Sequence, residues 1–135
     1  MTNVDVSGGA VPRFNRRDIA AFTRKVLQAV DHEVDEVSIA FVDDATMAGL
    51  NRKFRRKNKT TDVLTFPGED RFLGDIVICV DQARRQAAQE KHSLATEVRY
   101  LILHGVLHAM GYDHETDDGE MNALELQVRK RVGLR

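Results

Sequence analysis

The sequence predicts an α+β fold in which residues 1–135 form a single domain, with a small mixed β-sheet backed by helices. Apolar residues make up 42% of the 135 residues and charged residues 30%, which is typical of a globular chain with a buried core. Strand-like and helix-like apolar patterns are interspersed without strict alternation, which favours α+β over a parallel α/β sheet. The run Ile76–Val80 is almost continuously apolar, as expected of a central strand covered on both faces.

The N-terminal third begins with a weakly patterned segment. Residues 1–14, which are broken by Gly8-Gly9 and Pro12, are expected to form an edge strand and a loop. From Asn15, apolar residues recur at helical spacing, which predicts a helix that ends near Asp31. Asn15 and Asp18 have the residue types of a helix start. The inward residues of this helix are Ile19, Phe22, Val26 and Val30.

A strand and a short helix are predicted next. Alternating apolar residues indicate a strand from about Glu36 to Val42. Asp43 or Asp44 then caps a short helix. The residues expected to share one face of that helix are Met47, Leu50 and Phe54.

The next two strands are predicted at Asp62–Phe66 and Gly74–Val80. Pro67–Asp70 has the turn chemistry that joins them, so we expect an antiparallel hairpin whose second strand lies centrally.

Three helices complete the chain. Asp81 can cap a helix that runs to about Lys91, and Ser93 can start a longer one. The apolar residues of the longer helix are Leu94, Val98, Leu101, Ile102 and Val106. Asp117 with Glu120 is similar to a capping box at the start of a last helix. Its inward residues are Met121, Leu124, Val128 and Val132.

Three histidines near the C-terminus have the spacing of a metal site. His104 and His108 are four residues apart in the long predicted helix, so both imidazoles project from one face with Cβ atoms about 5 to 6 Å apart. Gly111 can adopt a positive φ and end the helix, after which the chain can turn to bring in His114. The predicted metal ligands are therefore His104, His108 and His114.

The ligand type indicates the ion and its chemistry. Neutral imidazole suits zinc and other late first-row divalent ions, and three protein ligands leave a fourth position for water or substrate. The expected cofactor is one divalent ion, most simply zinc, which in such a site lowers the pKa of bound water to about 7. If Asp113, Glu115 or Cys79 were a fourth ligand, no coordination position would be open to substrate, and the ion would only stabilise the fold. His32 and His92 are expected to be ordinary surface residues.

The position after the first histidine separates this chain from metzincin peptidases. Those enzymes share the skeleton H-x-x-x-H-x-x-G-x-x-H and carry glutamate directly after the first histidine as general base. Here that position is Gly105, which cannot accept a proton. A peptidase mechanism would need Asp113 or Glu115 as a substitute.

Three segments resemble one protein family. His104–His114 resembles the signature H-G-x-L-H-x-x-G-Y-D-H of the YbeY family of bacterial metal-dependent endoribonucleases. Asn51–Pro67 resembles the family's N-x-x-[FY]-R-x-K-[DN]-x-x-T-D-V-L-S-F-P, and Leu73–Ile76 matches its L-G-D-I. The matches occur in the family's order. The departures are Asn58 where Asp is usual, Thr60 where Pro is common and Thr65 in place of Ser.

The resemblance implies a substrate that composition alone could not indicate. It implies a single-strand-specific endoribonuclease that acts in 3′-end maturation of 16S rRNA in the small subunit and in ribosome quality control. Its implied partners are single-stranded RNA, rRNA, the ribosomal small subunit and ribosome-associated proteins. Arg55 aligns with the family's functionally important arginine and is the expected catalytic and substrate-binding residue. Lys57 is a second candidate for contact with the RNA backbone.

Charge limits where RNA could bind. The net charge is −1, so affinity for a polyanion must be local, and six of the eight residues from Arg52 to Lys59 are Lys or Arg.

Two alternative functions remain: a metal-dependent peptidase or other small hydrolase, and a non-catalytic zinc-stabilised module that binds RNA or the ribosome. The first predicts cleavage of unfolded protein, and the second predicts four protein ligands on the ion.

The cysteine count and the absence of long apolar runs indicate where in the cell the protein is expected. Cys79 is the single cysteine, so no intramolecular disulfide can form. We expect it to be a small buried apolar residue in a strand rather than a nucleophile or a fourth metal ligand. No apolar run approaches the roughly 20 residues that span a bilayer, and no signal-peptide pattern is present at the N-terminus. A cytoplasmic protein with no membrane partner is expected.

Overall fold

A mixed four-stranded β-sheet organises the chain. The computed structural model describes residues 1–56, 60–113 and 115–134. The strands are β1 (Asn3–Gly8), β2 (Glu36–Val42), β3 (Val63–Pro67) and β4 (Phe72–Cys79). Their order is β1-β2-β4-β3, with β1, β2 and β4 parallel and β3 antiparallel to β4. The α+β class, the edge position of β1, the β3–β4 hairpin and the central position of β4 are all confirmed.

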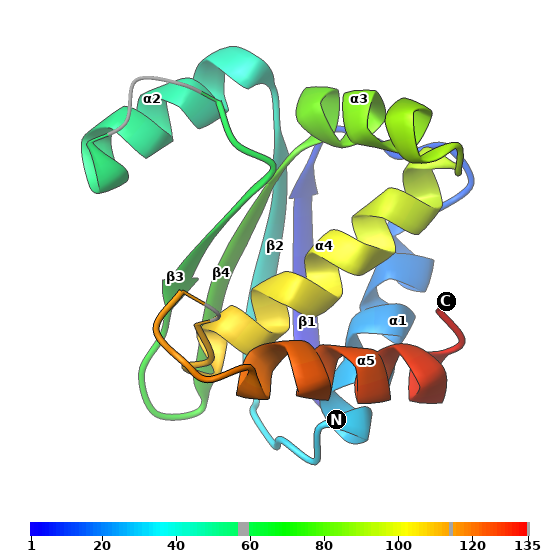
Figure 1. The fold of residues 1–135 in the computed structure, drawn as a ribbon, viewed down its shortest axis with the longest axis vertical. Helices are drawn as coiled ribbons and strands as arrows, with labels where there is room; N and C mark the ends of the chain where they lie inside the picture. Colours follow the sequence, from blue (N-terminus) through cyan, green and yellow to red (C-terminus); the bar gives the residue numbers. More distant parts are fainter. Residues whose placement is uncertain (57–59, 114, 135) are drawn as a thin grey trace.

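Helices cover both faces of this sheet in the described residues. They are α1 (Arg16–Ala29), α2 (Asp44–Arg55), α3 (Val80–Glu90), α4 (Leu94–Ala109) and α5 (Glu120–Val132). Figure 1 shows α4 lying across one face with α1 and α5 beside it, while α3 lies beyond the carboxyl end of β4. The opposite face packs against α2.

Alternation along β4 divides the core into two layers. Ile76 and Ile78 are fully buried in the large core beneath α1, α4 and α5. Val77 and Cys79 point the other way, into a smaller cluster with Met47 of α2. Because successive side chains of a strand point to opposite faces, a strand covered on both sides must be apolar throughout, as this one is.

Three predicted helix starts are confirmed by their caps. The side chains of Asn15, Asp43 and Ser93 accept hydrogen bonds from the backbone N–H groups of Asp18, Thr46 and Thr96, at 2.8, 2.9 and 3.1 Å. Each cap satisfies a backbone donor that the first helical turn leaves without an intrahelical acceptor.

Two other starts differ from the prediction. Asp81 does not cap α3, because β4 runs directly into that helix at Val80 and the N-cap position is Cys79. The Asp81 carboxylate instead accepts from the N–H of Asp44, at 3.0 Å. The N-cap position of α5 is Gly119 rather than Asp117. Asp117 lies before α5, but its side chain still accepts a hydrogen bond from the N–H of Met121 in the first turn of the helix, at 3.0 Å.

No helix in the described ranges has both the length and the apolar character needed to cross a lipid bilayer.

Candidate functional site

His104 and His108 converge at the C-terminal end of α4. Their Nε2 atoms lie 3.0 Å apart, and the ring centroids are 4.5 Å apart at an interplanar angle of 66°. Both side chains are partly buried rather than solvated. The i, i+4 spacing on a regular helix therefore directs two imidazole nitrogens to nearly the same point, as the sequence predicted.

A carboxylate on α5 contacts the far side of His104. The Nδ1 atom of His104 lies 3.4 Å from Oε1 of Glu125, and Oε2 of Glu125 accepts from Arg129 at 3.4 Å. An ionised carboxylate only accepts hydrogen bonds, so this contact favours a proton on Nδ1 and leaves the Nε2 lone pair of His104 directed at His108. Nothing in the sequence spacing pointed to Glu125, because α5 is brought beside α4 by packing alone.

The two histidines open into a pocket of about 360 Å³ along β3. Asn51 and Arg55 lie one turn apart on α2 and also line the pocket. They approach it from the face of the sheet opposite to α4. Arg55 is exposed, whereas Asn51 is buried, with 2% of its surface accessible. The structure thus brings Arg55 to the same pocket as the histidine pair, although the residues are about 50 positions apart in the chain.

Acidic residues also line this pocket. Asp62, Asp113 and Glu115 are part of its wall. The Asp62 carboxylate is held by the N–H of Val63 at 2.7 Å and by the side-chain amide of Gln86 at 3.3 Å. The sequence reasoning did not single out Asp62, although it lies within the segment Asn51–Pro67 that carries the family resemblance.

Behind Asp62 lies a polar network that corrects one expectation. Gln86 also donates to the buried carboxylate of Glu97, at 2.9 Å, and Glu97 contacts Nε2 of His92 at 2.6 Å. The His92 ring stacks on Tyr100, with centroids 5.7 Å apart. His92 is therefore not the ordinary surface residue that was predicted. It compensates a carboxylate that would otherwise be buried without enough partners.

Gly105 permits close packing of α4 on the sheet. A Cβ atom at this position would lie 2.6 Å from Cγ2 of Ile76, closer than real Cβ contacts. The side-chain direction at position 105 therefore points into the core and not into the pocket. A glutamate there would collide with β4, so position 105 cannot supply a peptidase base, whereas Asp113 and Glu115 do line the pocket.

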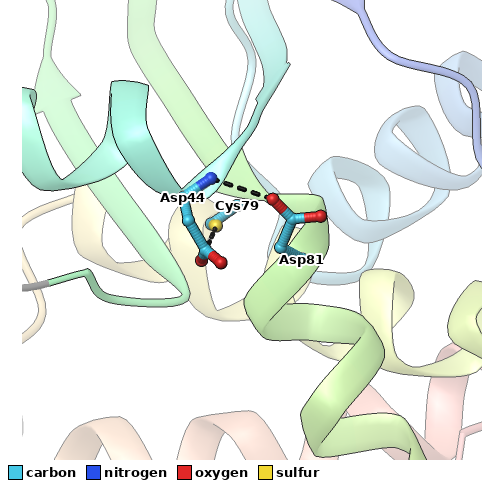
Figure 2. Close-up of side chains that lie close together, drawn as sticks. All are labelled: Asp44, Cys79 and Asp81. Atoms are coloured by element: carbon cyan, nitrogen blue, oxygen red, sulfur yellow. Dashed lines mark hydrogen bonds between the residues drawn. The ribbon is translucent and has the colours of Figure 1, made fainter.

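A second group of potential metal ligands lies near the junction of α2, β4 and α3. Atoms of Asp44, Cys79 and Asp81 that could ligate a metal lie within 4.8 Å of one another. Figure 2 shows the contacts between them: the Cys79 thiol donates to Asp44, and the N–H of Asp44 donates to Asp81.

An arginine pairs with each of the two carboxylates in this group: Arg85 with Asp44, and Arg84 with Asp81 at 3.6 Å. Arg85 donates to both oxygens of Asp44, at 2.7 and 2.9 Å. These bonds lower the pKa of Asp44 to about 2. Burial raises the pKa of the Cys79 thiol, so the neutral thiol is favoured over the thiolate that binds metals. The guanidinium therefore takes the place that a cation would have, and the group ties three elements together.

Cys79 is also unsuited as a fourth ligand of the histidine site. Its side chain packs with Met47 on the α2 face of the sheet, whereas α4 covers the opposite face. Asp113 and Glu115 do line the histidine pocket. Two predicted site residues, Lys57 and His114, lie outside the described residues.

Comparison with known proteins agrees with the resemblance found in the sequence. The family profile described as endoribonuclease YbeY matches residues 10–133. A protein of Nautilia profundicola named endoribonuclease YbeY is 46% identical over 102 residues, which cover 73% of each chain. A protein of the same name from Macrococcus caseolyticus is 36% identical, and the match covers 98% of this chain and 92% of that one.

The fold has a counterpart among solved structures. The solution structure of TM1509 from Thermotoga maritima superposes with a TM-score of 0.66 at 25% sequence identity, covering 96% of this chain and 89% of that one. Profile, relatives and fold agree over nearly the whole length of the sequence. The chain belongs to the endoribonuclease YbeY family.

Proposed function

We propose that this chain is a metal-dependent endoribonuclease that cleaves single-stranded RNA, with residues 1–135 acting as one catalytic domain. The single observation that carries the proposal is the approach of the His104 and His108 Nε2 atoms to 3.0 Å in a pocket that Arg55 also lines. The ion is held by His104, His108 and His114. The part of His114 rests on its spacing and on the family resemblance.

The geometry of the histidine pair supports a metal. Nitrogen ligands bind zinc at about 2.0 to 2.1 Å, so two of them in a tetrahedral site are separated by about 3.3 Å. The observed separation of 3.0 Å needs only a small adjustment of the rings. The carboxylates of Asp62, Asp113 and Glu115 make the pocket attractive to a divalent cation. Zinc is the simplest choice, and nickel or another borderline ion suits the same ligands.

The chain's own residues divide the work of cleavage. A divalent ion bound here supplies a Lewis acid for a phosphodiester. Arg55 grips two phosphate oxygens in a fork and stabilises the negative charge that grows on them in the transition state. Glu125 keeps His104 oriented. The pocket wall also carries the carboxylates of Asp62, Asp113 and Glu115, of which Asp62 is held in place by Val63 and Gln86.

The physiological substrate follows from the family resemblance. We infer a role in 3′-end maturation of 16S rRNA in the small subunit and in ribosome quality control, with ribosome-associated proteins as further partners. Such a substrate would place the protein in the cytoplasm. The basic residues from Arg52 to Arg56 give α2 a local positive charge that supports an RNA ligand despite the net charge of −1. Lys57 is proposed as a further contact to the RNA backbone.

The deciding experiment compares metal-loaded protein with its His108→Ala variant on single-stranded RNA and on DNA of matching sequence. We expect the wild type to cut RNA, and the variant to lose metal and cleavage together because an incomplete ligand set binds the ion weakly. Equal cleavage by both proteins would indicate a contaminating nuclease and remove the support for the proposal. Full metal retention by the variant in elemental analysis would overturn the ligand assignment.

Product analysis separates two routes of cleavage. A 2′,3′-cyclic phosphate would show that the 2′-OH of the substrate attacks phosphorus, a route closed to DNA. Cleavage of the matching DNA would rule out an obligatory 2′-OH nucleophile.

Two further measurements address the alternatives. A peptidase would degrade an unfolded protein and ignore RNA. A purely structural ion would have four protein ligands, which X-ray absorption spectroscopy of the zinc-loaded protein would reveal.

A further inference from the structure

Phe54, on the last turn of α2, has an exposed side chain. Met47 and Leu50 share its helical face, and Met47 is fully buried, but 54% of the Phe54 surface is accessible. Figure 1 shows the C-terminal end of α2 projecting beyond β3, the edge strand of the sheet. Single apolar side chains are often exposed on proteins, so the contacts around the Phe54 ring, and not its exposure alone, indicate a role.

The Phe54 ring is supported in a defined orientation. It meets Phe66 of β3 edge-to-face, with centroids 5.1 Å apart and an interplanar angle of 73°. Such aromatic pairs are worth more than the buried area alone. In addition, Nζ of Lys53 lies 5.3 Å from the Phe54 centroid. The ring is therefore a braced surface rather than a freely rotating side chain.

The Phe54–Phe66 pair adjoins the histidine pocket. Arg55, which follows Phe54 in the chain, lines the pocket, and so does Leu64, which shares the α2 face of β3 with Phe66. Four basic residues lie within two positions of Phe54 in the sequence, at the end of α2 and its C-cap: Arg52, Lys53, Arg55 and Arg56. An exposed aromatic ring among cationic groups is the combination that single-stranded nucleic acids bind, with phosphates on the cations and bases on the ring.

We propose that Phe54, braced by Phe66, is a stacking platform for one base of the single-stranded RNA whose phosphate lies at Arg55. This inference rests on the proposed function and adds a substrate subsite to it. Every base has an aromatic face, so the contact tolerates any sequence. Bases inside a duplex are already stacked on both sides and cannot use the platform, which gives a physical reason for a preference for single strands.

The absence of tryptophan from the sequence provides a direct binding probe. Phe54→Trp introduces a single indole at the platform, and Leu126→Trp introduces one at an apolar position on α5 that is 49% exposed. Titration uses a short 2′-O-methyl oligonucleotide, first single-stranded and then annealed to its complement. We expect the single strand to quench Phe54→Trp fluorescence, the duplex to quench it far less, and Leu126→Trp to respond to neither.

A kinetic comparison tests the same contact without a fluorophore. Phe54→Leu keeps an apolar side chain but removes the ring face, and Phe54→Tyr keeps the face. Loss of one stacked base typically weakens binding on the order of tenfold or more, so KM for single-stranded RNA should rise by about that factor in the leucine variant, with kcat little changed. The tyrosine variant should behave as the wild type. Circular dichroism melting checks that both variants fold.

The outcomes separate the platform from the nuclease itself. If the wild type cuts RNA while Phe54→Leu keeps its KM and Phe54→Trp is not quenched, the platform is wrong and the nuclease stands. If the single strand quenches Phe54→Trp but the wild type cuts no RNA, the platform stands and the proposed catalysis fails.

Discussion

Nδ1 of His104 and Oε1 of Glu125 lie 3.4 Å apart, across the contact between α4 and α5. Because the carboxylate accepts from Nδ1, it prepares Nε2 of the same ring to bind a metal.

We therefore expect Glu125→Gln to weaken zinc affinity by about 10- to 100-fold, the usual cost of losing a partner of a metal-binding histidine. Competition with a fluorescent chelator measures the affinity, and the spectrum of the cobalt-substituted protein reports ligand geometry. Glu90→Gln, an exposed carboxylate at the end of α3, is the charge-matched control. Unchanged affinity and an unchanged cobalt spectrum would exclude a positioning role for Glu125.

Arg55 is predicted to act on the rate of cleavage and not on metal binding. Arg55→Ala should retain the ion and lower the rate by about 100- to 1,000-fold, as is typical when one donor to a developing oxyanion is lost. Arg55→Lys should recover little of this, since an ammonium cannot form the fork. Single-turnover cleavage with measured metal content gives both quantities. Arg17→Ala, on α1, controls for loss of one positive charge, and equal rates for the two alanine variants would remove Arg55 from the site.

The contact between Gly105 and Ile76 predicts an unusual response to alanine. Alanine normally stabilises a helix interior by about 1 kcal/mol relative to glycine. At position 105 the new Cβ would lie 2.6 Å from Cγ2 of Ile76, and overpacking of a dense core costs about 1 to 3 kcal/mol. Urea unfolding should show lower stability for Gly105→Ala. Gly49→Ala on α2, whose nearest atom would be 4.0 Å away, should raise stability instead. A stabilising Gly105→Ala would contradict the packing.

The Asp44–Arg85 pair predicts a pH-dependent contribution to stability. The pKa of Asp44 is lowered from 3.8 to about 2, chiefly by the hydrogen bonds from Arg85. A carboxylate with a lowered pKa stabilises the fold above its unfolded pKa, and this contribution is lost as pH falls through the folded value. Asp44→Asn should therefore reduce Tm near neutral pH, with a deficit that shrinks between about pH 4 and pH 2. Asp5→Asn on β1 is the control, and a deficit independent of pH would refute the ion-pair explanation.

Much of the local structure could be predicted because its causes lie within a few residues of each other. The caps at Asn15, Asp43 and Ser93 each act on an N–H three residues ahead. The convergence of His104 and His108 likewise follows from the period of one helix. One of the two cap predictions that were wrong, at Asp81, failed because of a distant partner: the N–H of Asp44, which the sequence does not place nearby.

By itself, the sequence determined the α+β class, the order of its elements, the family and the i, i+4 histidine pair, since these depend on periodicity and on contiguous motifs. Only the tertiary structure decided that Arg55 shares a pocket with the histidines, that Glu125 contacts His104 and that Phe54 remains exposed. Each of these relationships joins or separates elements distant in sequence. Their placement follows from how helices pack on the two faces of the sheet, which no local pattern encodes.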